Sequence, residues 1–435
     1  MLKSIRLKNF KLHEDTLIEA APITVFIGPN NSGKSSIFQA LLLLRQAASR
    51  NDRLLCQSSA GEIPPQKPYE YSPQRAVDLG RFEEIRGRGG NDIHVEISGV
   101  IRAGVPTVGV NEVSVSARLQ VRVNQLVSHD GSVEVFGTKA SWGFVQGAPV
   151  RNTAISLGGV AYVLQVLDTF QLTMPGGYSG AIGGTERETL LLYNEASTLI
   201  GTTPSRLLAS LHPVYALRGF EEWGYPITDY APASLELLTL HDRAIALPNA
   251  LASDLGLKKR LSDRLEELLH ISIDFELVLP GKRLKIWAKT SANKADRTLF
   301  VNEGTGANQI PFIFVPVLLT PPNETILLSE PEAHLHPKGQ CDLTRLLVTV
   351  AKKENIQFFI ETHSEHVLHV ILNAVGKGEW AKEDVALHYF ENVEGTARVK
   401  RLGINEHGQV DGGLPGFFEQ SLKELTEFLH ALKKT

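Results

Sequence analysis

The segment Gly28–Ser35 constrains the fold of this chain more than any other. It reads Gly-Pro-Asn-Asn-Ser-Gly-Lys-Ser, which fits the pattern G-x-x-x-x-G-K-[ST] of a phosphate-binding loop. An apolar, β-rich stretch at residues 23–27 precedes it, and residues 35–48 have helical composition. A chance glycine turn would not need both neighbours. The sequence therefore predicts an α/β fold whose loop and helix N-terminus hold a phosphate group.

The residue types within the loop fit this chemistry. The glycines let backbone N–H groups curve around a phosphate without interference from a Cβ atom. We expect Lys34 to reach the β- and γ-phosphates of a nucleotide and the Ser35 hydroxyl to bind Mg²⁺. The nucleotide-binding residues predicted in this segment are Gly28, Asn30, Asn31, Ser32, Gly33, Lys34, Ser35 and Ser36.

An apolar strand that ends in acidic residues supplies the second half of the predicted site. Residues 326–332 read Ile-Leu-Leu-Ser-Glu-Pro-Glu, and a parallel strand would deliver these carboxylates to the edge where α/β sheets bind ligands. Glu330 is the candidate general base that polarises an attacking water molecule. For Glu332, a solvated strand end is a plausible alternative.

The remaining segments predict an α/β core interrupted by a long middle region. Strands are expected at 325–328, 356–360 and 385–389, with helices that begin at Lys338 and Glu365. In the middle, residues 51–90 are rich in Pro, Gly and Ser and predict loops, residues 92–175 alternate like antiparallel strands, and residues 233–272 look helical.

Composition narrows the function classes. A chain of 435 residues exceeds one typical domain, and its net charge of -4 argues against a uniformly basic nucleic-acid coat while permitting a local basic groove. Its two cysteines form no disulfide framework. The first residues alternate apolar and basic, unlike a signal peptide, and no apolar run approaches the ~20 residues that span a bilayer. We expect a soluble cytoplasmic protein without membrane contact.

Together, these motifs resemble the ABC-type ATPases of the RecF/SMC branch, and in particular the overcoming-lysogenization-defect (OLD) group of AAA-family ATPases. The resemblance covers roughly residues 1–50 and 300–420, and the middle is not matched with comparable specificity. It is carried by Asn9-Phe10, Gly28–Ser36, the stretch Glu-Pro-Glu-Ala-His-Leu-His-Pro at 330–337, Thr362-His363-Ser364, and the tail Asp-Gly-Gly-Leu-Pro-Gly-Phe-Phe at 411–418.

The resemblance implies ATP and Mg²⁺ as cofactors and assigns further residues. The stretch 303–309 resembles the divergent signature motif of this branch, so Gly304, Thr305 and Gly306 would meet the γ-phosphate of ATP bound to a second protomer. His363 resembles the switch histidine that contacts the γ-phosphate. The working state would then be a dimer that sandwiches two ATP molecules, or a larger homo-oligomer.

One position departs from the family pattern. The family usually has a carboxylate immediately before the catalytic glutamate, where it helps to hold Mg²⁺, whereas this chain has Ser329. A hydroxyl can order a metal-bound water molecule but adds no charge. We therefore expect weak Mg²⁺ binding through Ser329 and slow hydrolysis, with ATP acting partly as a structural switch. The glutamine that senses Mg²⁺ is unassigned, since Gln74 has no strong anchor around it.

OLD-type nucleases carry a toprim domain after the ATPase, and this chain offers little room for one. About 70 residues follow His363, and the acidic residues Glu383, Asp384, Glu391 and Glu394 form no D-x-D cluster. Any cutting activity is therefore expected in another polypeptide.

Nucleic-acid binding has weak support in the sequence. The arginine- and glycine-rich residues 81–90 and the basic cluster 258–260 could meet phosphates. A solvated turn and an exposed helix face explain them at least as well. Similarly, Phe417-Phe418 is either a partner patch or a small core anchor.

The predicted fold class is an α/β P-loop NTPase of the ABC-ATPase head type, with a β-rich and helical insertion between the phosphate loop and the signature motif. The expected divisions are 1–90, 91–300, 301–400 and a small segment 401–435. The resemblance implies an ATPase that acts as sensor or scaffold for a separately encoded nuclease or toxin effector in bacterial antiphage defence. Two alternatives stay open: a RecF-like DNA-repair clamp, and an ATP-dependent assembly scaffold with little hydrolysis.

Overall fold

A computed structural model describes most of both ends of the chain and parts of its middle. The described residues are 1–50, 85–87, 92–105, 110–123, 127–135, 138–145, 152–157, 160–166, 172–173, 206–216, 218–227, 243–279, 281–290 and 297–413. The loops expected over residues 51–84, including Gln74 and Arg81, lie outside these ranges, as do Arg88 and Phe417-Phe418.

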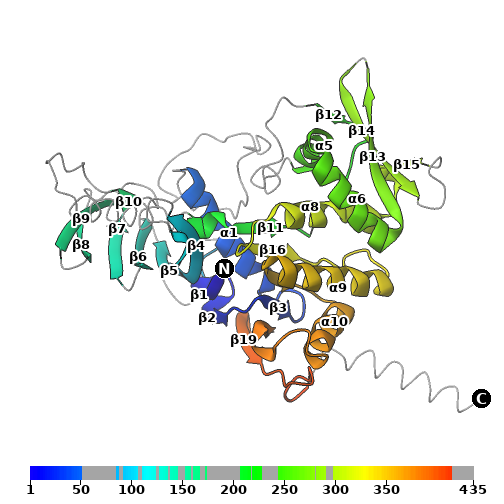
Figure 1. Ribbon diagram of the computed structural model, residues 1–435. Coiled ribbons are helices and arrows are strands. Elements are labelled where there is room, and N and C mark those ends of the chain that lie inside the picture. Colours follow the sequence, from blue (N-terminus) through cyan, green and yellow to red (C-terminus); the bar gives the residue numbers. More distant parts are fainter. Residues whose placement is uncertain are drawn as a thin grey trace, which may run out of the picture.

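A six-stranded central sheet joins the two ends of the chain (Figure 1). Its order is β11-β16-β17-β3-β18-β19, with the first five strands parallel and β19 antiparallel to β18. The N-terminal strand β3 thus lies between strands from the last third of the sequence. The strands are β3 (Ile23–Ile27), β11 (Leu211–Val214), β16 (Thr325–Ser329), β17 (Gln357–Glu361), β18 (Val385–Val393) and β19 (Thr396–Leu402).

Helices cover this sheet, and every residue of β3 and β17 is buried. Continuous apolar runs such as Ile-Thr-Val-Phe-Ile are typical of parallel strands that are covered on both faces. The predicted helix starts near Ser35, Lys338 and Glu365 are confirmed to within one residue. The helices are α1 (Lys34–Arg50), α8 (Pro311–Leu319), α9 (Pro337–Glu354) and α10 (Glu365–Gly376), with short turns η2 (Phe300–Asn302), α7 (Thr305–Gln309) and η3 (Lys382–Asp384).

A second, antiparallel sheet has the order β2-β1-β4-β5-β6-β7. It confirms the antiparallel pattern predicted for the middle of the chain. It also contains the first two strands, because β1 pairs with both β2 and β4. The strands are β1 (Leu2–Phe10), β2 (His13–Glu19), β4 (Ile93–Val105), β5 (Val110–Val123), β6 (Val127–Val135) and β7 (Thr138–Val145), with β8 (Asn152–Leu157), β9 (Val160–Val166) and β10 (Leu172–Thr173) forming a separate sheet.

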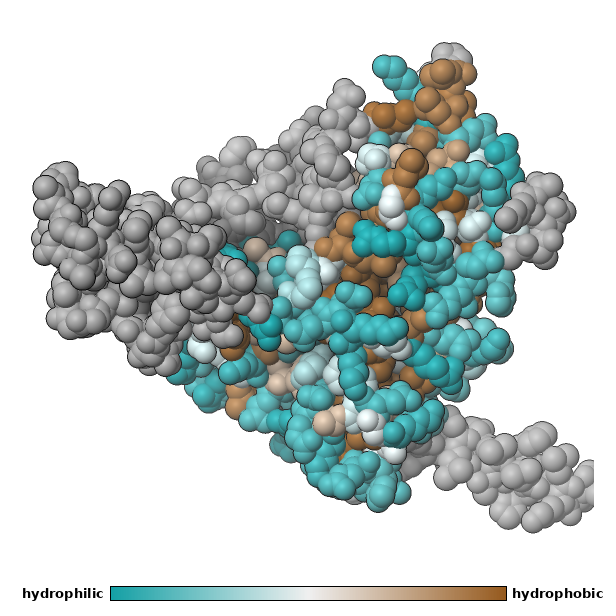
Figure 2. All heavy atoms as spheres, viewed as in Figure 1, coloured by the Kyte–Doolittle hydropathy of each residue, from teal (hydrophilic) through white to brown (hydrophobic). Residues whose placement is uncertain are grey.

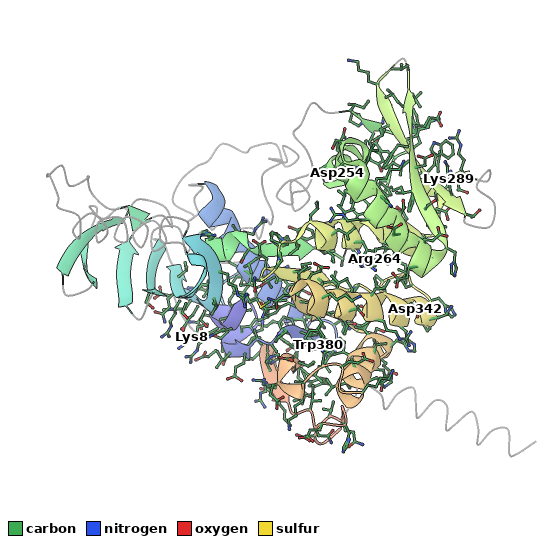
Figure 3. All side chains as sticks on the ribbon, in the orientation of Figure 1. Lys8, Asp254, Arg264, Lys289, Asp342 and Trp380 are labelled. Carbon is green, nitrogen blue, oxygen red and sulfur yellow. The ribbon has the colours of Figure 1, made fainter. Side chains whose placement is uncertain are left out.

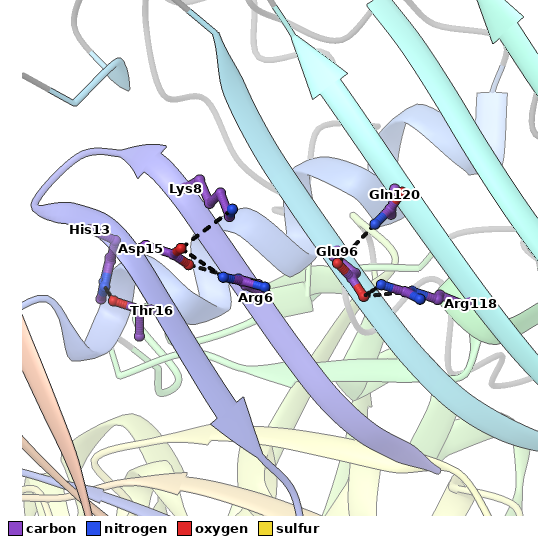
Figure 4. Close-up of polar contacts among 8 residues, drawn as sticks. All are labelled: Arg6, Lys8, His13, Asp15, Thr16, Glu96, Arg118 and Gln120. Atoms are coloured by element: carbon purple, nitrogen blue, oxygen red, sulfur yellow. Dashed lines mark hydrogen bonds and ion pairs between the residues drawn. The ribbon is translucent and has the colours of Figure 1, made fainter. Parts of the chain in front are cut away.

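The outer face of this sheet carries polar pairs between neighbouring strands (Figure 4). Asp15 accepts two hydrogen bonds from Arg6, both 2.7 Å long, and Glu96 accepts one of 2.6 Å from Arg118. Such exposed pairs contribute little to stability, because water screens the charges. A domain boundary near residue 90 would separate β1 from β4, although these two strands pair in the same sheet. The division of the chain into four parts stays a prediction.

A third unit packs through α6 against α8 and α9, two helices that belong to the same hydrophobic core as the central sheet (Figure 3). Leu257, Leu261 and Leu265 recur every four residues on α6 and are fully buried. The basic cluster 258–260 has structural contacts, because Lys258 donates to Asp274 (2.7 Å) and Arg260 donates to the carbonyl of Leu318 (3.2 Å). The unit comprises β12 (Tyr225–Pro226), α5 (Arg243–Ser253), α6 (Leu255–Leu269), β13 (Ile271–Val278), β14 (Arg283–Thr290) and β15 (Arg297–Leu299).

The coloured surface in Figure 2 is largely hydrophilic, with apolar groups visible near the β13–β14 hairpin and across the middle of this face. The exposed large apolar residues in this unit include Trp223, Leu277 and Leu279. No helix in the described ranges is long and apolar enough to cross a membrane.

An aromatic cluster fixes β3, the strand that carries the phosphate-binding loop. The Phe26 ring lies 5.2 Å from Phe390 on β18, 5.9 Å from Phe359 on β17 and 5.7 Å from Phe38 on α1, measured between ring centroids. These edge-on and tilted contacts add to the burial of Phe26, which is inaccessible to solvent. Phe26 therefore links the strand before the loop to the helix after it.

Burial of His388 should make the protein less stable at acidic pH. This residue donates a hydrogen bond from Nε2 to the carbonyl of Glu19 (2.9 Å), whereas its Nδ1 atom has no partner in the described part of the chain. Burial lowers the pKa of His388 to about 4 from 6.5, helped by the nearby Arg401 and opposed by Glu19. The unfolded chain therefore binds the extra proton between these pH values, so stability is lost as pH falls through this window.

We expect His388 alone to remove up to about 3 kcal/mol of unfolding free energy as the pH falls from about 7 to about 4. Urea unfolding measured across this range in the wild type and in His388→Gln tests the effect, since the variant should show a shallower loss. His407→Gln, a change at an exposed histidine, is the matched control. An equally steep loss in His388→Gln would contradict the assignment.

Candidate nucleotide-binding site

A cleft of about 760 Å³ opens at the carboxyl edge of the central sheet, a volume within the usual range for ligand sites. The loop after β3, the first turn of α1, and the segments that follow β16 and β17 line it. It brings together most of the residues predicted from the sequence. Those lining the cleft are Asn30, Asn31, Gly33, Lys34, Ser35, Ser36, Glu330 and His363.

Neighbouring strands impose the shape of the phosphate-binding loop. Gly28 has a φ of 139°, and a Cβ atom placed there would lie 2.2 Å from the carbonyl oxygen of Phe390 on β18. At Gly33, φ is 99° and a Cβ atom would lie 2.9 Å from Nε2 of His13. A side chain is excluded at both positions by contact and by backbone conformation. These glycines are therefore required by the fold before any ligand is considered.

Lys34 lies inside the loop with its ammonium group against backbone carbonyls. Nζ donates to the carbonyl oxygens of Gly28 (2.9 Å) and Pro29 (2.8 Å), and the residue is only 3% exposed. Burial lowers the pKa of Lys34, and the nearby carboxylates of Glu361 and Glu330 oppose this shift. The cation is thus held at the base of the cleft, where phosphate oxygens can take the place of the carbonyls.

Glu330 follows β16 in a left-handed backbone conformation, with a φ of 44°. Such a conformation is uncommon outside glycine and is often found at functional sites. Its N–H donates to the carbonyl of Glu361 (2.8 Å). Arg218 holds the same turn by donating to the carbonyls of Ser329 (2.8 Å) and Glu330 (2.7 Å). These bonds fix the position at which Glu330 enters the cleft.

Glu332 is buried, at 8% exposure, so the alternative of a solvated strand end is wrong. Its Oε1 atom accepts hydrogen bonds from the hydroxyl of Thr362 (2.7 Å) and the N–H of His363 (2.8 Å). Its Oε2 atom has no partner in the described ranges. Burial raises the pKa of the Glu332 carboxyl. Glu332 therefore ties the loop after β16 to the loop that carries His363.

His363 is exposed at the cleft. Desolvation, followed by the nearby Lys34 ammonium, keeps the pKa of His363 below its usual value. This shift favours the neutral ring, which can donate one hydrogen bond to an anionic ligand.

Glu361 is the main residue at this site that the sequence analysis missed. It ends β17, is 3% exposed, lines the cleft, and accepts a hydrogen bond at Oε1 from the hydroxyl of Ser35. Burial raises the pKa of the Glu361 carboxyl. The sequence did contain a signal for Glu361. It ends the apolar strand β17, in the same way that Glu330 comes directly after the apolar strand β16.

The turn between β1 and β2 also reaches the cleft, which no motif indicated. Nε2 of His13 lies 3.0 Å from the carbonyl oxygen of Gly33, and Nδ1 lies 2.9 Å from the hydroxyl of Thr16 (Figure 4). Lys11 donates to Oε1 of Gln39 (2.6 Å), and both line the cleft. The antiparallel sheet thus supports the phosphate-binding loop from outside the central sheet.

The signature segment does not line this cleft. Gly304 and Thr305 are exposed at the start of α7, and nothing lies within 4 Å of a Cβ atom placed at Gly304. At Gly306, a Cβ atom would lie 2.6 Å from the carbonyl oxygen of His334, so the close packing inside this chain already requires glycine there. Asn308 anchors α7 through hydrogen bonds with the backbone of Phe220 (2.7 and 2.9 Å).

Three other predicted residues lie near the cleft without lining it, namely Gly28, Ser32 and Ser329. The Ser329 carbonyl binds Arg218. His336 caps the N-terminus of α9 by accepting a bond from the N–H of Lys338 (3.4 Å), which is a structural role. Among the residues that the structure describes, no group of three or more His, Cys, Asp or Glu side chains could hold a metal ion.

Comparison with known protein families finds similarity to an ATPase domain at both ends of the chain. The family model described as an AAA ATPase domain matches residues 1–85 and 303–368, which carry the phosphate-binding loop and the acidic strand. A model for a protein family of unknown function, DUF3696, matches residues 381–428. The predicted α/β P-loop fold, split by a long insertion, is thereby confirmed. No curated protein matches the chain.

Solved structures of SMC heads are similar at low identity. The SMC head domain from Thermotoga maritima has a TM-score of 0.42 and 13% identity, covering 93% of this chain and 99% of that one. The Smc head domain from Pyrococcus furiosus, bound to the C-terminal domain of ScpA, has a TM-score of 0.40 and 14% identity, covering 98% and 99%. Similarity at this level does not establish a shared function.

Removing Arg218 should impair hydrolysis more than nucleotide binding, because its guanidinium holds the turn that carries Glu330. We expect Arg218→Ala to lower the rate of ATP hydrolysis about ten- to hundredfold. The affinity for ATP should change little, since Arg218 holds the turn at Glu330 and is not among the described residues that line the cleft. Steady-state turnover and equilibrium binding test this, with the exposed Arg345→Ala as control. Wild-type turnover in Arg218→Ala would argue against a positioning role.

Proposed function

We propose that the chain binds ATP with Mg²⁺ in this cleft and hydrolyses it, with Glu330 as the general base. The observation that carries the proposal is the convergence of Lys34, Ser35, Glu330 and His363 on one cleft. These residues come from segments at opposite ends of the sequence. The matched ATPase domain supports the same conclusion.

Each residue has a role that follows from its position. Lys34 would stabilise charge on the β- and γ-phosphates, and the backbone N–H groups at the start of α1 would bind the same anion. Glu330 would accept the proton of the attacking water, while His363 would donate a hydrogen bond to the γ-phosphate. Catalysis would depend mainly on positioning and on charge stabilisation.

The site suits Mg²⁺, although the described residues contain no cluster of three metal ligands. Mg²⁺ in nucleotide sites usually takes one or two protein oxygens and completes its octahedron with phosphate oxygens and water. The Ser35 hydroxyl, which lies in the cleft and contacts a carboxylate, fits such a set. Bound there, the ion would neutralise charge that develops on the phosphates.

Lys34→Ala should abolish ATP binding because it removes the cation at the base of the cleft. Glu330→Gln should keep ATP binding and lose hydrolysis, since an amide cannot accept the proton of the attacking water. Binding of a fluorescent ATP analogue and phosphate release measure the two effects. The exposed Lys353→Ala and Glu354→Gln, at the distant end of α9, are matched controls. Unchanged hydrolysis in Lys34→Ala or Glu330→Gln would refute the proposed site.

We further propose that the signature segment of a second copy completes the cleft. Gly304 and Thr305 are exposed at a helix start, and they do not line the cleft of their own chain. A neighbouring protomer could therefore place them against the γ-phosphate, giving a dimer that sandwiches two ATP molecules.

Complementation tests this arrangement. Gly304→Asp should fold, because φ is -55° and no atom lies near its Cβ position, but its charge would repel the γ-phosphate. Alone, Gly304→Asp and Lys34→Ala should both be inactive. Mixed in equal amounts, they should recover about a quarter of wild-type hydrolysis, because half of the dimers would hold one intact composite site. No recovery, or full activity of Gly304→Asp alone, would rule out a signature that acts in trans.

For the cellular role, we propose a sensor or scaffold that controls a separately encoded nuclease or toxin effector in antiphage defence. The support is the resemblance of residues 1–50 and 300–420 to the OLD group. Co-purification with the product of an adjacent gene, released or activated on infection, would support this role. Stimulation of hydrolysis by bare DNA would instead favour a RecF-like repair clamp. Assembly driven by ATP alone, without turnover, would favour a scaffold.

A further inference from the structure

The proposed metal site has Ser329 at the position where the resembled family usually has a carboxylate. Ser329 ends β16, and its partner in the register of the neighbouring parallel strand is Glu361, the last residue of β17. Adjacent strands lie about 4.8 Å apart. A carboxylate that is absent at the end of one strand is therefore present at the same level on the next strand.

The contacts of Glu361 place its carboxylate at the metal-binding hydroxyl. Oε1 accepts a hydrogen bond from the hydroxyl of Ser35, the first residue after Lys34 in the phosphate-binding loop. Mg²⁺ holds its ligands at 2.0–2.1 Å in an octahedron, so neighbouring ligand oxygens lie about 3 Å apart. A hydroxyl and a carboxylate within hydrogen-bonding distance of each other meet that requirement with little movement.

The burial of Glu361 supports a cation at this point. The side chain is 3% exposed, and within the described ranges no lysine or arginine forms an ion pair with it. Lys34, whose charge acts on the Glu361 carboxyl, directs its ammonium group to the carbonyls of Gly28 and Pro29. A buried carboxylate without an ion-pair partner is costly. A divalent ion between Glu361 and Ser35 would remove that cost.

We propose that Glu361, on β17, supplies the protein carboxylate that holds Mg²⁺ beside Ser35, in place of the residue that ends β16. This inference rests on the proposed ATP site. It leaves Glu330 available as the base, since that residue enters the same cleft from the next strand. It also removes the reason for expecting slow hydrolysis from Ser329.

The test is the gain in ATP affinity that Mg²⁺ provides, measured by titration with a fluorescent ATP analogue in Mg²⁺ and in EDTA. Loss of residues that merely orient metal ligands costs about 10–100-fold in metal affinity, so Glu361→Gln should lose at least about tenfold of the gain. Its affinity in EDTA should be no lower than that of the wild type, because without Mg²⁺ the Glu361 carboxylate only repels the phosphates. Glu354→Gln, an exposed change on α9, is the matched control. Thermal unfolding verifies that each variant is folded.

A rescue variant tests whether the carboxylate, rather than the shape of residue 361, is required. Ser329→Asp in the Glu361→Gln background places a carboxylate on β16, at the residue that pairs in register with position 361. This double variant should restore most of the gain in ATP affinity that Mg²⁺ provides. Glu361→Asp should keep part of it. Mn²⁺ binding in the presence of ATP can be measured from the decrease in the electron paramagnetic resonance signal of the free ion. The amount of bound Mn²⁺ should fall in Glu361→Gln and recover in the double variant.

The outcomes separate this inference from the proposed function. Wild-type protein that binds no ATP would refute the ATP site itself. Wild-type protein that binds ATP, together with a full Mg²⁺ gain in Glu361→Gln, would overturn only the role of Glu361. Loss of ATP affinity in EDTA in this variant would also overturn it, because Glu361 would then act on the shape of the loop.

Discussion

The parallel pairing of β3 with β17 on one side and β18 on the other is the constraint on which the rest of the structure depends. It joins residues 23–27 to strands more than three hundred positions later in the sequence. Because the strands are parallel, their carboxyl ends meet at one edge. The phosphate-binding loop, Glu330 and Glu361 lie together for this reason, and the packing of Phe26 against Phe359 and Phe390 stabilises the arrangement.

The polar groups at this edge are held mainly by backbone atoms. Lys34 donates to two loop carbonyls, Arg218 donates to the carbonyls of the turn at Glu330, and Glu332 accepts from the N–H of His363. Buried charges are costly unless they are hydrogen-bonded, and these contacts lower that cost without neutralising the carboxylates. The cleft is lined by three acidic residues (Glu14, Glu330 and Glu361) and three basic ones (Lys11, Lys34 and Arg86). The carboxylates of Glu330 and Glu361 lie beside the phosphate-binding loop, where a cation that arrives with the nucleotide would be stabilised.

Secondary structure was largely predictable because each element carries a local signal. Short apolar runs bounded by turns predicted the strands at 23–27 and 325–328, and the leucine spacing over 255–269 predicted a helix; the observed elements are Ile23–Ile27, Thr325–Ser329 and Leu255–Leu269. The pairing of β1 with β4 was not predictable, because antiparallel alternation does not identify a partner. Nor did any motif mark Arg218, whose role depends on a backbone turn that is more than a hundred positions away.

The sequence by itself determined the phosphate-binding loop, the acidic strand and the α/β class, because loop glycines, a lysine at a helix start and apolar periodicity act over short distances. Only the tertiary structure decided which carboxylate reaches Ser35. Ser329 and Glu361 are separate in the sequence and become register partners when β16 and β17 pair. Likewise, Glu332 could be a solvated strand end by sequence, and only the packing of the Thr362 loop against it makes it buried. Burial and register are properties of neighbouring segments, which no single stretch of sequence contains.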